Sequence, residues 1–165
     1  MRTDTGQVFR LEDYRPSDYL IPSTELVFSL SPDKTRVVSQ LTIERRAGLD
    51  KVTPLMLDGD GLVLSRIEID GKELAPDAYR ATPDQLVIMN PPTAGSFKLA
   101  IETEIAPAAN LAFMGLFRSN RVYCTQCEAE GFRRITYFLD RPDILSAYTV
   151  RITKGLRILE LFSSS

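Results

Sequence analysis

The chain has 165 residues, 44% of them hydrophobic and 25% charged, and its formal net charge is −2. This composition is typical of a globular protein with one domain. The largest basic clusters are the pairs Arg45–Arg46 and Arg133–Arg134, which are too small to form the basic surface that binds nucleic acid. No apolar run approaches the ~20 residues that cross a bilayer. We therefore expect no nucleic-acid partner and no membrane span.

The sequence contains no histidine. This absence excludes a Ser-His-Asp triad, a Cys-His dyad and an HExxH zinc motif within this chain. The first residues carry acidic groups and lack an apolar segment, so they do not resemble a secretory signal. Two cysteines without such a signal are typical of a reducing compartment, and we expect a cytoplasmic protein.

Short segments with a period of two dominate most of the chain. Residues 1–22 form a polar lead-in, and the predicted β-rich domain covers residues 23–153. Along this domain, hydrophobic residues alternate with polar ones, as they do in strands with one buried face. The first predicted strands are 26–30, 37–44, 62–69, 86–89 and 97–105.

Turn residues separate these strands. Asp70-Gly71 is a two-residue hairpin signal, and the run 58–61, Asp-Gly-Asp-Gly, precedes the third predicted strand. Residues 90–92, Asn-Pro-Pro, end the fourth, because proline has no N–H to donate to a sheet. The predicted fold class is therefore mainly β, an antiparallel sheet or sandwich.

The pattern changes after Pro107. Apolar side chains recur at helical spacing and predict one short helix near 131–139. Pro142 follows it, and the residue before a proline avoids helical angles, so the helix should end there. A further strand is predicted at 148–153, and the tail 154–165 is predicted to be irregular or truncated.

Cys124 and Cys127 form a CxxC pair. As metal ligands they would supply half of a tetrahedral zinc site, and the sequence offers no histidine or second CxxC pair to complete it. As a redox pair they should open a helix, whose dipole lowers the pKa of the first thiol, but Cys124 lies in a strand-like run. Free cysteine more often packs as a small hydrophobic residue. We favour a structural role and keep redox or metal binding as alternatives.

Gln126, Glu128 and Glu130 lie between the cysteines and the predicted helix. Glutamate in a polar loop is usually solvated, and that interpretation remains open. The same position also suits ligand binding, because loops held by a rigid scaffold often carry binding groups. A carboxylate can receive a ligand ammonium, while the glutamine amide supplies both a donor and an acceptor.

Several stretches of the sequence follow one known pattern over about residues 11–153. They are LEDYRPSDYLI (11–21), LVFSLSPDKTRVVSQLTIERR (26–46), PLMLDGDGLVL (54–64), EIAPAANLAFMGLFRS (104–119) and YCTQCEAEGFRRITYFLDRPD (123–143). With these stretches the chain resembles the N-terminal domain of bacterial aminopeptidase N, a zinc metallopeptidase of the gluzincin group, and the last stretch is the most specific. The likeness fades in KGLRILELFSSS (154–165), where we expect a truncated or altered end.

The resemblance implies a saddle of antiparallel β-sheet that docks against a thermolysin-like catalytic domain. It implies that Glu128 helps to bind the α-amino group of a peptide substrate and that Gln126 lines the same subsite. Cys124 and Cys127 would then be scaffold residues that flank the loop. The family's zinc ligands and general base belong to the catalytic domain, so this chain is expected to hold no catalytic residue and no metal.

Two further roles accompany the resemblance. Glu130 is expected to shape the loop, and Pro142 to turn the chain back after the predicted helix. The function implied is removal of N-terminal amino acids from peptides by the complete zinc enzyme, with no peptidase activity in this chain alone. The alternative is a separate β-sandwich that binds a protein partner through its exposed edges.

Overall fold

The computed structural model describes residues 12, 14–49, 51–93, 95–154 and 157–163, with side chains up to residue 153. The remaining lead-in residues, 1–11 and 13, lie outside this description, as do 164 and 165 of the tail. The elements in chain order are β1 (Tyr19–Ser29), β2 (Thr35–Arg45), β3 (Leu55–Asp58), β4 (Val63–Ile69), β5 (Lys72–Glu73), β6 (Tyr79–Thr82), β7 (Gln85–Ile88), β8 (Ser96–Ile105), β9 (Gly115–Ser119), β10 (Val122–Gln126), the 3-10 helix η2 (Phe132–Arg134), β11 (Ala147–Lys154) and β12 (Arg157–Ser163).

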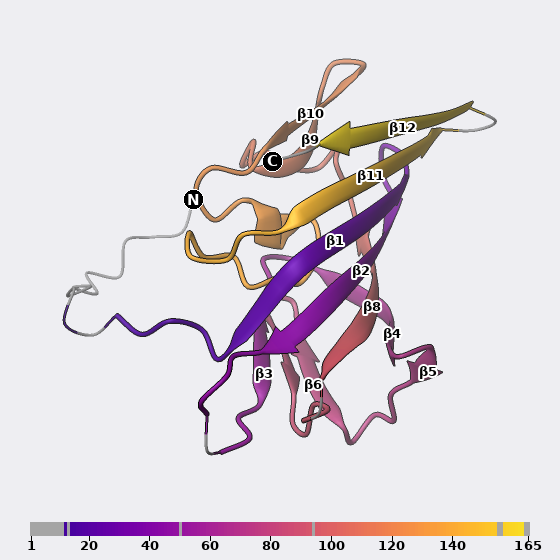
Figure 1. The fold of residues 1–165 in the computed structure, drawn as a ribbon. Coiled ribbons are helices and arrows are strands. Elements are labelled where there is room, and N and C mark those ends of the chain that lie inside the picture. The colour runs from indigo at the N-terminus through magenta and orange to yellow at the C-terminus, as the bar shows by residue number, and fades with distance from the viewer. Residues whose placement is uncertain (1–11, 13, 50, 94, 155–156, 164–165) are drawn as a thin grey trace.

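A seven-stranded sheet forms the body of the domain, in the order β12-β11-β1-β2-β8-β4-β5. Neighbouring strands of this sheet pair antiparallel, except β1 and β11, which run parallel. A three-stranded sheet, β3-β7-β6, and a hairpin, β9-β10, complete the structure (Figure 1). The predicted fold class, mainly β with antiparallel sheets, is confirmed.

The pairing of β1 with β2 changes register between Leu20 and Ser23. Before this irregularity Tyr19 faces the interior, and after it Leu26 does, although a strict period of two would place them on opposite faces. Pro22 lies within the irregular pair, where a residue without an N–H costs no sheet hydrogen bond. This irregularity, a β-bulge, therefore lets both halves of β1 direct their buried side chains to the same inner face of the sheet.

Two hydrophobic clusters share that inner face. The larger one lies between the seven-stranded sheet and β3-β7, and it includes Leu41, Leu57, Leu86 and Leu99. The smaller one lies toward the hairpin β9-β10 and consists of Leu26, Phe28, Val37, Leu116 and Ile135. The seven-stranded sheet is thus covered at one end by the small sheet and at the other by the hairpin.

Hydroxyl groups replace apolar side chains where the two clusters meet. Ser39 of β2 and Thr136 are fully buried, and their hydroxyl oxygens are 2.8 Å apart in a hydrogen bond. Thr103 of β8 donates from its Oγ1 to the carbonyl oxygen of Ile135 at 3.0 Å. These bonds satisfy polar groups that would otherwise be buried without partners, and they fix residues 135–136 against the sheet.

The predicted helix over 131–139 is confirmed only in its first residues. Phe132–Arg134 form one turn of 3-10 helix, and Phe138 then pairs with Asp58 in an isolated antiparallel bridge, N to O at 3.0 and 2.8 Å. Residues 135–139 are all buried, so this segment has no solvent-facing side of the kind that an amphipathic helix requires. The prediction was wrong beyond η2 because the chain here crosses between two layers.

Other boundaries also differ from the sequence pattern. β1 begins at Tyr19, within the range predicted as lead-in. The backbone of Arg157–Ser163 forms β12 on β11, so the tail is not irregular there. Alternation of Ile158, Glu160 and Phe162 with two leucines is a pattern suited to such a strand. The division into 1–22, 23–153 and 154–165 stays a prediction. No helix in the described part of the chain has the length and apolar character required to cross a membrane.

Replacing Thr136 by Val tests the buried hydroxyl contacts. The variant keeps the side-chain shape and removes the nearer of the two partners of the Ser39 hydroxyl, the other being the carbonyl oxygen of Ile101 at 3.4 Å. We therefore expect a loss of about 1–3 kcal/mol in the free energy of unfolding. Urea denaturation measures this loss. Thr42→Val is the matched control, because Thr42 bonds Ser23 at a half-buried position, and its effect should be smaller. Equal stability of Thr136→Val and the original chain would contradict the assigned role of this bond.

Candidate functional site

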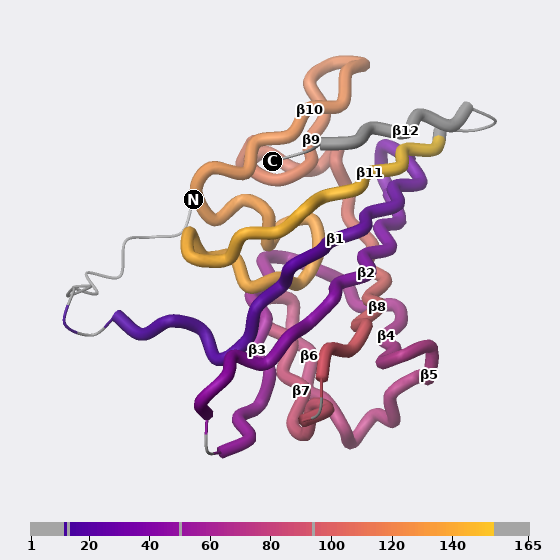
Figure 2. The backbone as a smooth tube through the Cα atoms, in the orientation of Figure 1, coloured from indigo at the N-terminus to yellow at the C-terminus, as the bar shows by residue number. Residues whose placement is uncertain are grey.

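The turn that follows β10 carries the polar residues singled out in the sequence. β10 ends at Gln126, opposite Gly115 of β9, and the N–H of Gly131 then donates to the carbonyl oxygen of Cys127 at 2.9 Å. This bond closes the turn 127–131, which we call the recognition turn. In Figure 2 the orange tube beyond β10 runs between β10 above and β3 below, so both smaller layers flank this region.

Two glycines allow the recognition turn to pack closely. A Cβ on Gly131 would lie 2.6 Å from the carbonyl oxygen of Gln126 and 2.8 Å from the Cα of Cys127, which no real side chain tolerates. A Cβ on Gly115 would lie 2.7 Å from the Cβ of Arg134. The sequence pattern placed Gly131 at a helix start and gave no signal for this contact. Glycine at both positions brings the end of the hairpin against the turn.

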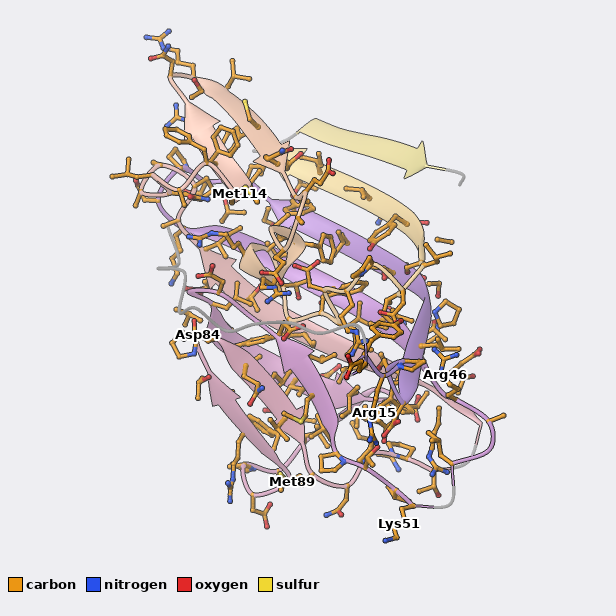
Figure 3. All side chains as sticks on the ribbon, turned by 90° about the vertical axis from the view of Figure 1, so that its left-hand side faces the viewer. Arg15, Arg46, Lys51, Asp84, Met89 and Met114 are labelled. Atoms are coloured by element: carbon orange, nitrogen blue, oxygen red, sulfur yellow. The ribbon has the colours of Figure 1, made fainter. Side chains whose placement is uncertain are left out.

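The recognition turn lies between the hairpin and the small sheet. Met114, labelled beside the hairpin in Figure 3, would have its Cε 3.0 Å from a Cβ added to Gly131. Asp84, labelled beside the three-stranded sheet, lines a polar pocket together with Arg133. The turn is therefore framed by two different layers of the fold.

Gln126, Glu128 and Glu130 all lie exposed on or beside this turn. Within the described part of the chain, the carboxylate of Glu128 has no hydrogen bond or ion pair, whereas Glu130 pairs with Arg133, Oε1 to NH2 at 3.4 Å. The Glu128–Ala129 peptide bond is cis. The structure thus brings the three predicted residues to one place and leaves the Glu128 carboxylate able to receive a charged ligand.

Arg133 is a buried residue of this region whose role the sequence pattern did not indicate. It is the one charged residue among the buried residues of the described side chains, and its Nε donates to Asp140 Oδ2 at 3.1 Å. The sequence showed it only as half of a basic pair, which ordinarily indicates a solvated surface. Its burial depends on Asp58 and Asp140, and Asp58 lies far from it in the chain.

A polar pocket of about 530 Å³ opens beside Arg133. Burial raises the pKa of Asp58, although the positive charge of Arg133 opposes the change. Arg134 bonds Asp60 on the same side, NH1 to Oδ2 at 2.6 Å. Two ion pairs, Asp58–Arg133 and Asp60–Arg134, therefore form part of the pocket wall. Its lining residues are Asp58, Gly59, Asp60, Asp84, Gln85, Arg133 and Arg134.

The two cysteines are free and half-buried. Cys127 lines an apolar groove of about 460 Å³ between the hairpin and strands β1 and β11. Burial raises the pKa of the Cys127 thiol, and the negative charge of Asp140 raises it further. A reactive or metal-binding cysteine needs a lowered pKa, so this environment favours the packing interpretation over the redox one.

Pro142 follows the buried segment in a turn closed by the N–H of Ile144, which donates to the carbonyl oxygen of Arg141 at 3.1 Å. Proline suits the second position of such a turn because its φ is already fixed near the required value. Arg141 also pairs with Asp143, Nε to Oδ1 at 3.0 Å. This placement agrees with the predicted reversal of the chain before β11.

The residues present do not fit a zinc site. The sequence has no histidine, and no group of three His, Cys, Asp or Glu residues among the described side chains could hold a metal ion. We therefore assign no zinc chemistry to the described residues of this chain. What the site offers is an exposed carboxylate on a turn that is fixed on several sides.

The family model described as the peptidase M1 N-terminal domain matches residues 16–161. The chain belongs to this family.

The curated relatives that the chain matches are much longer proteins. The chain is 49% identical to aminopeptidase N of Caulobacter vibrioides over 164 residues, which is 99% of this chain and 18% of that protein. It is 44% identical to aminopeptidase N of Escherichia coli over 150 residues, 91% of this chain and 17% of that protein. The chain thus spans about a fifth of the length of these relatives.

Solved structures agree with the fold. Aminopeptidase A of Legionella pneumophila, in complex with aspartic acid, matches with a TM-score of 0.79 and 28% identity, over 87% of this chain and 17% of that one. The M1 zinc metallopeptidase of Deinococcus radiodurans, an E323A mutant bound to a Tyr-Ser-Ala substrate, matches with a TM-score of 0.68 over 83% of this chain and 33% of that one. At 16% identity the second match supports the fold alone.

Alkylation of Cys127 tests the packing interpretation of the CxxC pair. In a Cys124→Ser variant, iodoacetamide should react slowly at neutral pH, and the pH midpoint of the rate should lie above that of a free thiol, because burial disfavours the thiolate. The same variant unfolded in urea is the control and should give the ordinary midpoint. A midpoint below the free value in the folded chain would favour the redox alternative instead.

Proposed function

We propose that this chain is the amine-recognition part of a zinc-dependent aminopeptidase that removes N-terminal amino acids from peptides. Glu128 binds the α-ammonium group of the substrate, and Gln126 lines the same subsite. The observation that carries the proposal is the exposed Glu128 carboxylate, unpaired among the described residues and mounted on a turn closed by Gly131. Membership of the M1 family and the identity to aminopeptidase N of Caulobacter vibrioides support it.

A carboxylate is the group that this task requires. An aminopeptidase has to hold the substrate ammonium at a fixed distance from the reacting bond, so that only the first peptide bond is cleaved. A charge-assisted hydrogen bond of this kind contributes about 1.5–3 kcal/mol. An internal peptide bond or an acetylated N-terminus offers no ammonium and loses this contribution. In this proposal Glu128 selects the substrate and performs no bond cleavage.

Gln126 suits a neighbouring role. It is the last residue of β10 and is exposed, so the strand fixes its backbone while its amide remains accessible. The amide carries a donor and an acceptor, and it can bond the substrate without adding a charge that competes with Glu128. We assign it to the wall of the first subsite.

The partners of the chain follow from the same proposal. The remaining four fifths of an enzyme of the Caulobacter type would supply the zinc ligands, the general base and the rest of the substrate pocket, and this catalytic part is the proposed docking partner. We place the protein in the cytoplasm. Two free cysteines in a domain without a disulfide suit a reducing compartment.

The chain alone should have no peptidase activity. It has no histidine, and a single wall of a site cannot activate water for attack on a peptide bond. Hydrolysis of alanine p-nitroanilide by the purified chain measures this, with aminopeptidase N of Caulobacter vibrioides as positive control. Turnover that co-purifies with the chain and disappears in Glu128→Ala would contradict the proposal.

Replacing Glu128 tests its role in a working enzyme. We suggest a chimera in which this chain replaces the 164 aligned residues of the Caulobacter enzyme. Glu128→Gln should lower kcat/KM for free-amine substrates about 10- to 100-fold, the factor that corresponds to a lost charge-assisted bond, while the zinc content stays unchanged.

The matched control for this experiment is Glu104→Gln. Glu104 pairs with Lys34 on the seven-stranded sheet, Oε2 to Nζ at 3.0 Å, and the change removes one carboxylate without touching the recognition turn. Its kinetics should equal those of the unmodified chimera. If Glu128→Gln has the same kinetics as the unmodified chimera, Glu128 does not bind the substrate amine. That result would favour a protein-binding module instead.

A further inference from the structure

Arg133 connects the recognition turn to the frame of the domain, and we infer that it is a positioning residue that sets the direction of the Glu128 carboxylate through Glu130. The inference rests on the proposed function, since it concerns the same site. Arg133 is buried and its guanidinium is paired with carboxylates, so we assign it no direct contact with the substrate. Its contacts divide into one group that fixes the guanidinium and another that holds the turn.

Asp140 fixes Arg133 at three points. The backbone N–H and the Nε of Arg133 both donate to Asp140 Oδ2 at 3.1 Å, and the NH2 donates to the Asp140 carbonyl oxygen at 2.9 Å. The carbonyl oxygen of Arg133 in turn accepts from the N–H of Asp60 at 3.0 Å. A planar guanidinium bonded to one residue through both its Nε and its NH2 cannot rotate freely. The orientation of Arg133 is thus determined by residues outside the turn.

The same guanidinium extends to the turn. Its NH2 lies 3.4 Å from Glu130 Oε1 and 3.9 Å from Asp58 Oδ2. Glu130 has φ of 64°, a left-handed conformation that non-glycine residues adopt at an energetic cost and keep where surrounding contacts hold them. The ion pair with Arg133 is the side-chain contact that holds Glu130 among the described residues.

Glu130 controls Glu128 because both lie inside one small closed turn. The bond from the Gly131 N–H to the Cys127 carbonyl oxygen joins the two ends, and Glu128 and Glu130 are separated by Ala129 alone. The Glu128 side chain has no hydrogen bond or ion pair in the described part of the chain, so its direction depends on the backbone of the turn. Loss of the ion pair between Glu130 and Arg133 removes one of the constraints on that backbone.

The test is a double-mutant cycle in the chimera defined above. Glu130→Ala alone should lower kcat/KM for free-amine substrates about two- to five-fold, the factor that corresponds to the loss of an exposed ion pair. Glu130→Gln keeps an acceptor oxygen and should recover part of this loss. In the Glu128→Ala background the effect of Glu130→Ala should disappear, because Glu130 acts through Glu128.

Controls separate positioning from stability. Glu104→Ala removes the ion pair with Lys34 and should leave kcat/KM unchanged in both backgrounds. Arg133→Lys keeps the charge but lacks the planar fork that bonds Asp140 and Glu130 together. In the variant that retains Glu128, its loss should therefore be at least as large as that of Glu130→Ala.

The possible failures are distinguishable. If Glu128→Ala lowers kcat/KM while Glu130→Ala has no effect, or has the same effect with and without Glu128, the positioning role is overturned and the proposed function stands. If Glu128→Ala itself leaves kcat/KM unchanged, the proposed function fails, and the positioning role fails with it.

Discussion

The backbone of residues 132–139 crosses between two layers of sheet, and its polar groups have to be satisfied inside the protein. The fold meets this constraint from both sides. Phe138 pairs with Asp58 of β3, and the carbonyl oxygen of Ile135 accepts from Thr103 of β8. Because the crossing segment is fixed in this way, the turn immediately before it has a rigid support. The rest of the site depends on that support.

The same constraint explains why a charged residue is tolerated in the interior. Burying Arg133 is costly unless carboxylates compensate its charge. Asp140, which directly follows the crossing segment, and Asp58 of β3 supply that compensation. A buried pair of this kind contributes less to net stability than to a defined geometry. The ion pair between Arg133 and the exposed Glu130 connects this fixed geometry to the surface. The recognition turn is therefore part of the packed domain and not a free loop.

The sequence predicted those elements whose buried faces follow a simple period. Strands such as β2 and β8 were expected from alternation, and the Asp70-Gly71 hairpin was expected from residues that both adopt positive φ, 49° and 76°. Periodicity predicted a helix over 131–139 that the structure does not form beyond Arg134. Apolar residues at helical spacing also suit a buried extended segment. Periodicity could not find Arg133, whose partner Asp58 is distant in the chain. Glu128 was singled out by the resemblance, since a glutamate in a polar loop has no distinctive pattern of its own.

We propose that Glu128 holds the ammonium group of a substrate, and the structure of a complex would show this contact itself. A crystal structure of the chimera with a free amino acid, such as alanine, would locate that group. We expect an ammonium nitrogen about 2.7–2.9 Å from a Glu128 carboxylate oxygen, with the turn 127–131 still closed by the bond from the Gly131 N–H to the Cys127 carbonyl oxygen. An amino acid bound with its ammonium on other residues, and Glu128 directed into solvent, would contradict it.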